Sequence, residues 1–337
     1  MKRHVFHDND HDGVLAAAIF LYCRGNLTRH YQYHTGDPIP NIEFKSDDEV
    51  YFMDCVPKAD DLLDLAQKVH SVTVMDHHMA AFADLEACSL PQPNVHLIFD
   101  EHRAACEIVA GFLTETQGHT MYPRLSLINN VAIHDLGLHQ GTSEADVTRH
   151  TYAKSIVSFL DAEVMWRKPE ERVEAMRHVF AHWDESKERR AVEVGAYLRK
   201  EALRRDKALF DEKAVHGFAK LWSDGWHRGE TVSAVLVPHI GLNKEVASLD
   251  REVLIMYAQY RDGIVLSFRS GGIYDGVALE MAQFLGGNGH PNAAGTKVQY
   301  ADISFTGKDN FAFYRFSSNT PYGKKILDFT AWQNKTT

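Results

Sequence analysis

The pattern of apolar and polar positions over the first 135 residues alternates between two kinds of segment. Short apolar runs rich in β-branched and aromatic residues predict strands at residues 3–6, 30–34, 50–53, 71–75 and 95–99. Between them, apolar residues recur at helical spacing and predict helices at residues 14–24, 60–69, 102–116 and 123–134. Strands that alternate with helices are typical of an α/β fold with a doubly wound, mainly parallel sheet.

The pattern changes near residue 143. Residues 143–222 predict long charged helices, for example at 169–183 and 185–210, and contain no convincing strand. Strand patterns return at residues 232–238, 253–260, 263–270 and 311–317, with a helix at 277–285. We therefore predict three parts: an α/β domain at 1–142, a helical linker or extension at 143–222, and a smaller α+β domain at 223–337.

The charge balance limits the partners of this protein. The 337 residues include 46 acidic and 36 basic side chains, for a net charge of −10, so no overall positive field holds a long duplex. A nucleic-acid ligand would therefore be short, or held by metals and a local patch. The four cysteines lie far apart, which argues against a disulfide framework or a cysteine zinc site. The 20 histidines are unusually many, and several stand beside aspartates.

The N-terminal segment bears on the expected location. The longest uncharged apolar run, residues 14–23, is about half as long as a membrane span requires. It follows the polar sequence HDNDHD, where a signal peptide would be apolar. We expect a cytoplasmic protein without a membrane partner.

Aspartates follow three of the predicted strands. The strand at 3–6 leads to Asp8, Asp10 and Asp12, the strand at 50–53 leads to Asp54, and the strand at 71–75 leads to Asp76. The carboxyl ends of parallel strands lie along one edge of the sheet, where ligand sites of open α/β sheets form. We therefore expect these aspartates to converge.

The sequence HDNDHDG at residues 7–13 begins like a calcium-binding loop. An EF-hand requires a glutamate at loop position twelve, and counting from Asp8 that position is Ile19, inside an apolar helix. A calcium loop is therefore excluded. A helix-capping turn would explain one aspartate equally well. Three aspartates at alternate positions repel one another unless cations neutralise them, so we predict metal binding here.

Two further segments contain metal-competent residues. Asp76, His77 and His78 directly follow a strand, and imidazole with carboxylate suits manganese, magnesium or zinc. By itself, such a histidine pair would be interpreted as part of an ordinary solvated loop. Metal binding is favoured because the pair shares the strand-end edge of the sheet with the aspartates. Asp135 follows an apolar helix and by itself would be an ordinary loop residue.

The glycine-rich segment GGNGHPNAAG at residues 286–295 lies in the second predicted domain. It lacks both the Lys-Ser/Thr ending of a P-loop and the spacing of a dinucleotide fingerprint. The glycines let backbone approach a ligand, and a helix could begin at Pro291, which together predict an anion site that His290 faces. A flexible turn is the alternative.

These five motifs, in this order, resemble those of the DHH-family phosphoesterases with their DHH-associated domain. That family includes RecJ-type exonucleases, nanoRNases and cyclic-dinucleotide phosphodiesterases. The resemblance covers roughly residues 1–140 and 225–330, and the helical middle has no counterpart in it. It implies two divalent cations, usually Mn²⁺ with Mg²⁺ as the alternative, in a cleft between the two domains.

The resemblance also implies the role of each residue. The implied metal ligands are Asp10, Asp12, Asp54, His77 and Asp135, with Asp8 and His7 as further candidates. In this set Asp54 bridges both metals. The implied catalytic residues are Asp54, His77, Asp76 and His78. In this group Asp76 orients a histidine, and His78 faces the phosphate. The implied phosphate-binding residues of the second domain are Arg269, Ser270, Gly287, Gly289 and His290.

The expected reaction is hydrolysis of short single-stranded RNA or DNA to mononucleotides. Two cations lower the pKa of a bridging water, and the resulting hydroxide attacks phosphorus in line. The compact chain leaves little room for the extra nucleic-acid modules of a full RecJ-type enzyme.

Other functions stay open at this stage. They are a phosphodiesterase of linear or cyclic dinucleotides, an adenosine bisphosphate phosphatase, a RecJ-like exonuclease, and a nucleotide-binding module without catalysis. An inorganic pyrophosphatase shares the DHH core but is disfavoured, because the second domain of that group lacks a motif like GGNGHP. Whether the chain acts alone or as a homodimer also stays open.

Overall fold

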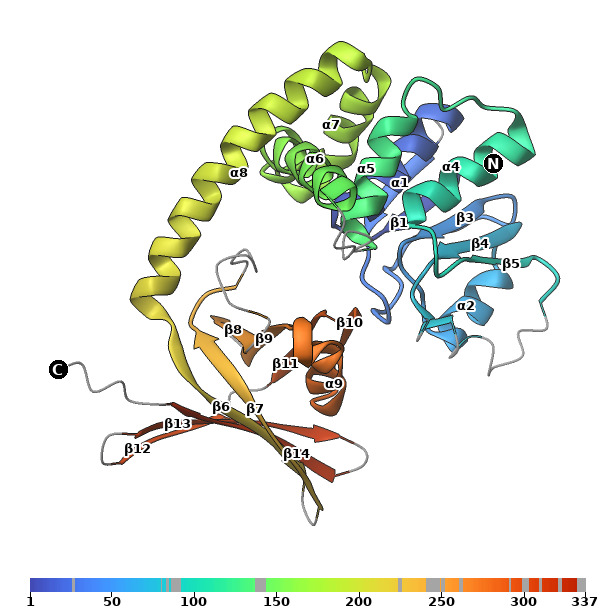
Figure 1. Ribbon diagram of the computed structural model, residues 1–337. Coiled ribbons are helices and arrows are strands. Elements are labelled where there is room, and N and C mark those ends of the chain that lie inside the picture. Colours follow the sequence, from blue (N-terminus) through green and yellow to red (C-terminus); the bar gives the residue numbers. More distant parts are fainter. Residues whose placement is uncertain are drawn as a thin grey trace. The chain divides into compact units, whose positions relative to one another are not determined.

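The chain divides into two compact units, Met1–Arg199 and Lys200–Thr337. The computed structural model (Figure 1) describes residues 1–25, 28–79, 81–82, 85, 92–136, 144–223, 226–240, 249, 252–260, 263–290, 292–298, 303–308, 311–320 and 323–331. Each unit has its own buried apolar core. None of the helices in these ranges combines the length and the apolar character that a membrane crossing needs.

The first unit contains a five-stranded sheet in the order β2-β1-β3-β4-β5, and all four pairings are parallel. The strands are β1 (Arg3–His7), β2 (Thr28–Gln32), β3 (Glu49–Met53), β4 (Ser71–Asp76) and β5 (Val95–Phe99). The predicted parallel sheet is confirmed, although β2 begins two residues before the predicted strand. The inner strands β1, β3 and β4 are buried along almost their whole length, which explains their nearly continuous apolar sequences.

Helices cover both faces of this sheet (Figure 1). On one face, α1 (His11–Arg24), α4 (Ala105–Gln117) and α5 (Leu125–Asp135) share a core with alternate strand residues such as Val5 and Met53. On the other face, α2 (Ala59–Ala66) packs with the intervening residues, such as Phe6 and Phe52. The alternation of strand side chains therefore divides the core into two layers, as in a doubly wound fold.

The helical middle contributes to the core of the first unit. It comprises α6 (Glu144–Leu160), the π-helical turn η1 (Asp161–Met165), α7 (Pro169–Ala181) and α8 (Glu185–Lys213). Phe159, Val173 and Phe180 are fully or almost fully buried in the same cluster as α1 and α4. The segment up to about Arg199 is therefore a packed part of the first unit.

One prediction for this segment is wrong. Residues 143–222 were expected to be helical, but Val215–Ser223 forms strand β6. This strand pairs with β7 on one side and with β14, near the end of the chain, on the other. Pairing with β14, which is distant in sequence, overrides a weak local pattern that contains Gly217 and Lys220.

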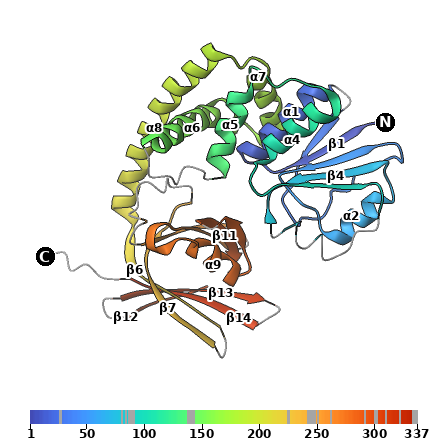
Figure 2. The same cartoon turned by 45° about the vertical axis from the view of Figure 1, so that its right-hand side comes forward.

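The second unit contains a nine-stranded sheet in the order β10-β11-β9-β8-β7-β6-β14-β13-β12. Its remaining strands are β7 (Trp226–Val237), β8 (Val253–Tyr260), β9 (Gly263–Arg269), β10 (Asn288–His290), β11 (Ala293–Val298), β12 (Ile303–Lys308), β13 (Phe311–Thr320) and β14 (Gly323–Ala331). The helix α9 (Val277–Phe284) lies beside β11 and packs Met281 and Ala282 into the core of this unit (Figure 2). The predicted α+β second domain is confirmed in its class.

Candidate metal centre

The strand order places the candidate centre at a switch point of the first sheet. From β1 the chain continues to β2 on one side, while β3 lies on the other side of β1. Open α/β sheets bind ligands outside the carboxyl ends of the strands at such a point. Asp10 and Asp12 follow β1, Asp54 follows β3, and Asp76 ends β4, so all four lie along this edge.

His77 is the residue around which the candidate ligands converge. Its Nε2 lies 3.3 Å from Oδ1 of Asp54, 3.4 Å from Oδ2 of Asp135 and 3.9 Å from Oδ2 of Asp12. Two groups of metal-competent residues share it: Asp12, His77 and Asp135 form one, and Asp54, Asp76, His77 and His78 form the other. Within each group the ligand atoms lie within 4.8 Å of one another. The structure thus brings together side chains from four separate segments.

The backbone of neighbouring helices fixes the aspartates of the first motif. Oδ2 and Oδ1 of Asp12 accept hydrogen bonds from the N–H groups of Ala105 (2.7 Å) and Cys106 (2.9 Å), at the N-terminus of α4. Oδ1 of Asp10 accepts from the N–H of Gly13 (2.9 Å) and caps α1. Asp10 therefore caps a helix, which is the alternative that the sequence offered for one of these aspartates. It also lies in the candidate metal loop.

Asp54 has a strained backbone. Its φ is 60°, and it is the one non-glycine residue with positive φ among those described. Its N–H donates to the carbonyl of Met75 (3.0 Å), and its Oδ2 is buried without a hydrogen-bond partner in the described part of the chain. Left-handed backbone at a non-glycine residue costs free energy and clusters at functional sites.

Asp76 orients the two histidines of the DHH sequence. Its Oδ1 accepts from the backbone N–H of His77 (2.7 Å) and from Nδ1–H of His78 (2.8 Å). Burial lowers the pKa of His78, but the hydrogen bond and the charge of Asp76, with further carboxylates, outweigh it and raise the pKa to about 9. The carboxylates beside His78 therefore favour its protonated form in the metal-free centre.

The carboxylates of the centre are crowded. Burial, followed by the charge of Asp10, raises the pKa of Asp12 to about 7. Burial, followed by the charges of Asp10 and Asp12, raises the pKa of Asp54 well above the ordinary range. Burial, followed by the charges of Asp12 and Asp10, does the same for the pKa of Asp135. Oδ2 of Asp54, of Asp76 and of Asp135 has no hydrogen-bond partner among the described residues. Carboxylate oxygens of this kind, together with imidazole nitrogen, fit Mn²⁺ or Mg²⁺.

His7 and Asp8 differ in their suitability as ligands. Nδ1–H of the buried His7 donates to the carbonyl of Asp8 (2.7 Å), which leaves a lone pair on Nε2, and burial lowers its pKa to about 4. A neutral histidine held in this way is ready to bind a metal. Oδ1 of Asp8 accepts instead from the N–H of Asn9 (2.6 Å) and from Nδ1–H of His34 (2.8 Å). The sequence interpretation omitted His34, although its position just after β2 places it at the same edge.

Arg269 ends β9 in the second unit. Its Nη1 donates to Oγ of Ser267 (2.9 Å) and to the carbonyl of Phe268 (2.8 Å), and it forms no ion pair with any described residue. Burial lowers its pKa. A guanidinium held this way without a carboxylate partner suits an anionic ligand.

Ser270 follows Arg269 and forms hydrogen bonds that organise this loop. Its hydroxyl donates to Oδ1 of Asn292 (3.0 Å) and accepts from the N–H of Ala278 (3.0 Å), so it links the loop after β9 to α9. Asn292 also accepts from the N–H of Gly276 (2.9 Å) and donates to Asp275 (2.6 Å). Asn292 is thus a second organising residue that the sequence interpretation did not single out.

The glycine-rich motif forms a strand hairpin. Strand β10 runs antiparallel to β11, so no helix follows Pro291 and that expectation is wrong. Side chains at Gly287 and Gly289 would collide with the backbone of β11, which explains both glycines and the close approach of the strands. The side chain of His290 lies outside the described residues.

No protein-family model and no curated protein matches this chain. Among solved structures, the chain is similar to PggH, a pGpG-specific phosphodiesterase from Vibrio cholerae, with 15% identity and a TM-score of 0.50 over 90% of this chain and 95% of that one. The chain therefore shares the fold of PggH. CDC45 from Entamoeba histolytica aligns with 8% identity and a TM-score of 0.47 over 99% of this chain and 93% of that one.

The alignment with PggH extends into the helical middle. The part of this chain outside the alignment is shorter than segment 143–222, because the alignment covers 90% of the residues.

Proposed function

We propose that this protein is a metal-dependent phosphodiesterase that hydrolyses short oligonucleotides, RNA or DNA, to mononucleotides. The observation that supports this most is the convergence of Asp12, Asp54 and Asp135 on Nε2 of His77. Buried carboxylates with raised pKa values, brought together at the switch point of an α/β sheet, need cations for their charged forms to coexist. The fold shared with PggH, a phosphodiesterase, supports the same conclusion.

The residues of the first unit would hold two divalent cations, with Mn²⁺ the best candidate and Mg²⁺ the alternative. Asp10, Asp12, Asp54, His77, Asp135 and His7 are the candidate ligands. Such cations lower the pKa of bound water and neutralise charge on phosphoryl oxygens.

The protein's own groups would add further electrostatic stabilisation. Asp76 accepts a hydrogen bond from His78 and favours its protonated form, so His78 would supply positive charge for an anionic phosphoryl group. Arg269, fixed by Ser267 and Phe268, would bind phosphate oxygens, with His290 and the backbone of Gly287 and Gly289. Ser270 would position this loop rather than contact the phosphate.

A linear dinucleotide is the second candidate substrate. The phosphodiesterase with the similar fold is named as specific for pGpG, and a dinucleotide is the shortest member of the substrate class proposed here. Short oligonucleotides and a linear dinucleotide would be cleaved at the same metal centre. The two substrates differ in the number of nucleotides that lie beyond this centre.

The test is a substrate panel. Purified protein with Mn²⁺ would be offered end-labelled RNA and DNA of two to about twenty nucleotides, pGpG, cyclic dinucleotides and adenosine bisphosphate. We expect mononucleotide release from the shortest strands, loss of activity with a chelator, and recovery on adding Mn²⁺. Chelator-resistant activity, or activity on adenosine bisphosphate alone, would contradict the proposal.

A further inference from the structure

A hydrogen bond joins the candidate metal loop to the helical middle. Nε2–H of His11 donates to Oδ1 of Asp161 at 3.0 Å, between residues that are 150 positions apart. His11 stands between the candidate ligands Asp10 and Asp12 in sequence and is the first residue of α1. Asp161 is the first residue of the π-helical turn η1.

The π-helical turn holds Asp161 in a fixed place. Leu160, directly before the turn, and Val164, inside it, are fully buried in the core of the first unit. The carbonyl of Asp161 accepts from the N–H of Trp166 (2.9 Å). Single π-helical turns interrupt α-helices rarely and are frequent at functional sites. The carboxylate itself is partly exposed, so burial does not explain its hydrogen bond to His11.

His11 also contacts the end of α5. Its ring lies 6.1 Å from the ring of His134, centroid to centroid, with an interplanar angle of 80°. His134 directly precedes the candidate ligand Asp135. His11 therefore lies between two segments that supply candidate ligands, and Asp161 holds it there.

The aspartates of the loop have anchors of their own. Asp8 bonds to His34, Asp10 bonds to the N–H of Gly13, and Asp12 bonds to the N-terminus of α4. Asp161 anchors His11, which stands between Asp10 and Asp12 in sequence. Groups that orient metal-binding segments without touching the metal influence affinity strongly.

We infer that Asp161 is a positioning residue of the metal centre that acts through His11. This inference rests on the proposed function only in that the centre binds divalent cations. It gives the helical middle a role, because η1 supplies a group that holds the first metal motif.

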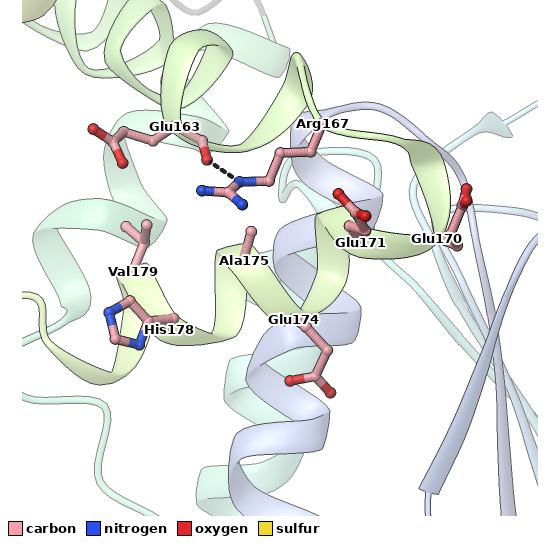
Figure 3. A pocket seen from close by; sticks show the side chains of 8 residues that line it. All are labelled: Glu163, Arg167, Glu170, Glu171, Glu174, Ala175, His178 and Val179. Atoms are coloured by element: carbon pink, nitrogen blue, oxygen red, sulfur yellow. Dashed lines mark hydrogen bonds between the residues drawn. The ribbon is translucent and has the colours of Figure 1, made fainter.

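The first test measures the Kd of Mn²⁺ by calorimetry on the metal-free full chain. We expect Asp161→Ala to weaken binding about tenfold, and Asp161→Asn, which keeps an acceptor oxygen, to recover part of that loss. Glu163→Ala is the matched control. Glu163 belongs to the same π-helical turn but lines a separate pocket beside α7 with Arg167 and Glu174 (Figure 3). The Glu163→Ala protein should therefore bind Mn²⁺ with the Kd of the wild type.

A double-mutant cycle then tests the route through His11. If Asp161 acts through His11, adding Asp161→Ala to His11→Ala should weaken Mn²⁺ binding little further. Fully additive losses, or an Asp161→Ala protein that loses thermal stability while its Kd stays that of the wild type, would overturn the inference alone. A wild-type protein that binds no Mn²⁺ would overturn both this inference and the proposed function.

Discussion

Asp54 connects the strained backbone of the fold to the proposed chemistry. Asn tolerates its φ of 60° better than other residues do and removes the charge, so Asp54→Asn should fold normally. We expect turnover to fall by roughly a hundredfold or more, because loss of a direct ligand costs more than loss of an outer one. Turnover and bound Mn²⁺ should be measured together, with Asp64→Asn on the exposed side of α2 as control.

Asp54→Ala is a less informative variant. Alanine at a left-handed position adds strain of about 1–2 kcal/mol, so lost activity would be mixed with lost stability. Undiminished turnover of Asp54→Asn at matched metal loading would contradict the proposed role of Asp54 as a ligand of both metals.

The raised pKa of Asp12 predicts how Mn²⁺ stabilises the protein at different pH. Its pKa lies near 3.8 in an unfolded chain and at about 7 in the fold. Because the folded value is higher, this group stabilises the metal-free fold at acidic pH, and the contribution is lost as pH rises from about 4 to 7. Mn²⁺ replaces the proton, so the rise in Tm on adding Mn²⁺ should be larger at about pH 8 than at about pH 5. An equal rise at both values would contradict this explanation.

At the scale of elements, the turn from β1 into α1 depends on Gly13. A Cβ atom at this position would lie 2.6 Å from the carbonyl oxygen of Asp8, so Gly13→Ala should displace the loop that carries Asp10. We expect weaker Mn²⁺ binding and a lower Tm, measured by calorimetry.

Gly111→Ala in α4 is the control for Gly13→Ala. There the added Cβ would meet the flexible end of the Arg103 side chain instead of backbone, and alanine favours the helix. Normal Mn²⁺ binding by both variants would show that the close approach at Gly13 has no importance for the centre.

Much of the first sheet could be predicted because its inner strands β1, β3 and β4 are nearly continuous apolar runs with aspartates at or just after their ends. The same rule placed Asp10, Asp54 and Asp76 at one edge without any knowledge of tertiary contacts. Features that depend on distant partners could not be predicted. Strand β6 exists through its pairing with β14, and Asp161 became relevant only through its contact with a residue 150 positions away. The helix expected after Pro291 failed because Gly287 and Gly289 allow β10 to pair with β11.

At the scale of the whole molecule, the candidate metal ligands and Arg269 belong to different units. Arg269→Ala should therefore raise KM by roughly tenfold or more while bound Mn²⁺ stays unchanged, since a hydrogen bond to a charged group contributes about 1.5–3 kcal/mol. Arg269→Lys keeps the charge without the planar fork and should be intermediate. Measuring KM and bound Mn²⁺ for each Arg269 variant tests this prediction. Loss of metal from Arg269→Ala would show that this division of roles is wrong.

The charge of the chain bears on substrate length. The net charge is −10, and the basic residues of α8 are interleaved with acidic ones; for example, Arg204 pairs with Glu201 at 3.2 Å and Lys207 pairs with Asp211. These pairs favour a solvated helix face over a basic track for long strands. Long strands should therefore meet like-charge repulsion that salt screens.

The most direct measurement is kcat/KM for mononucleotide release from an end-labelled dinucleotide and from a strand of about twenty nucleotides, with Mn²⁺, at low and high salt. We predict Mn²⁺-dependent release with higher efficiency for the dinucleotide, and a gap that narrows as salt rises. Faster release from the long strand at low salt, lost on replacing Arg204 and Arg205, would indicate a RecJ-like exonuclease instead. No release from either strand by the Mn²⁺-bound protein would contradict the proposed phosphodiesterase activity.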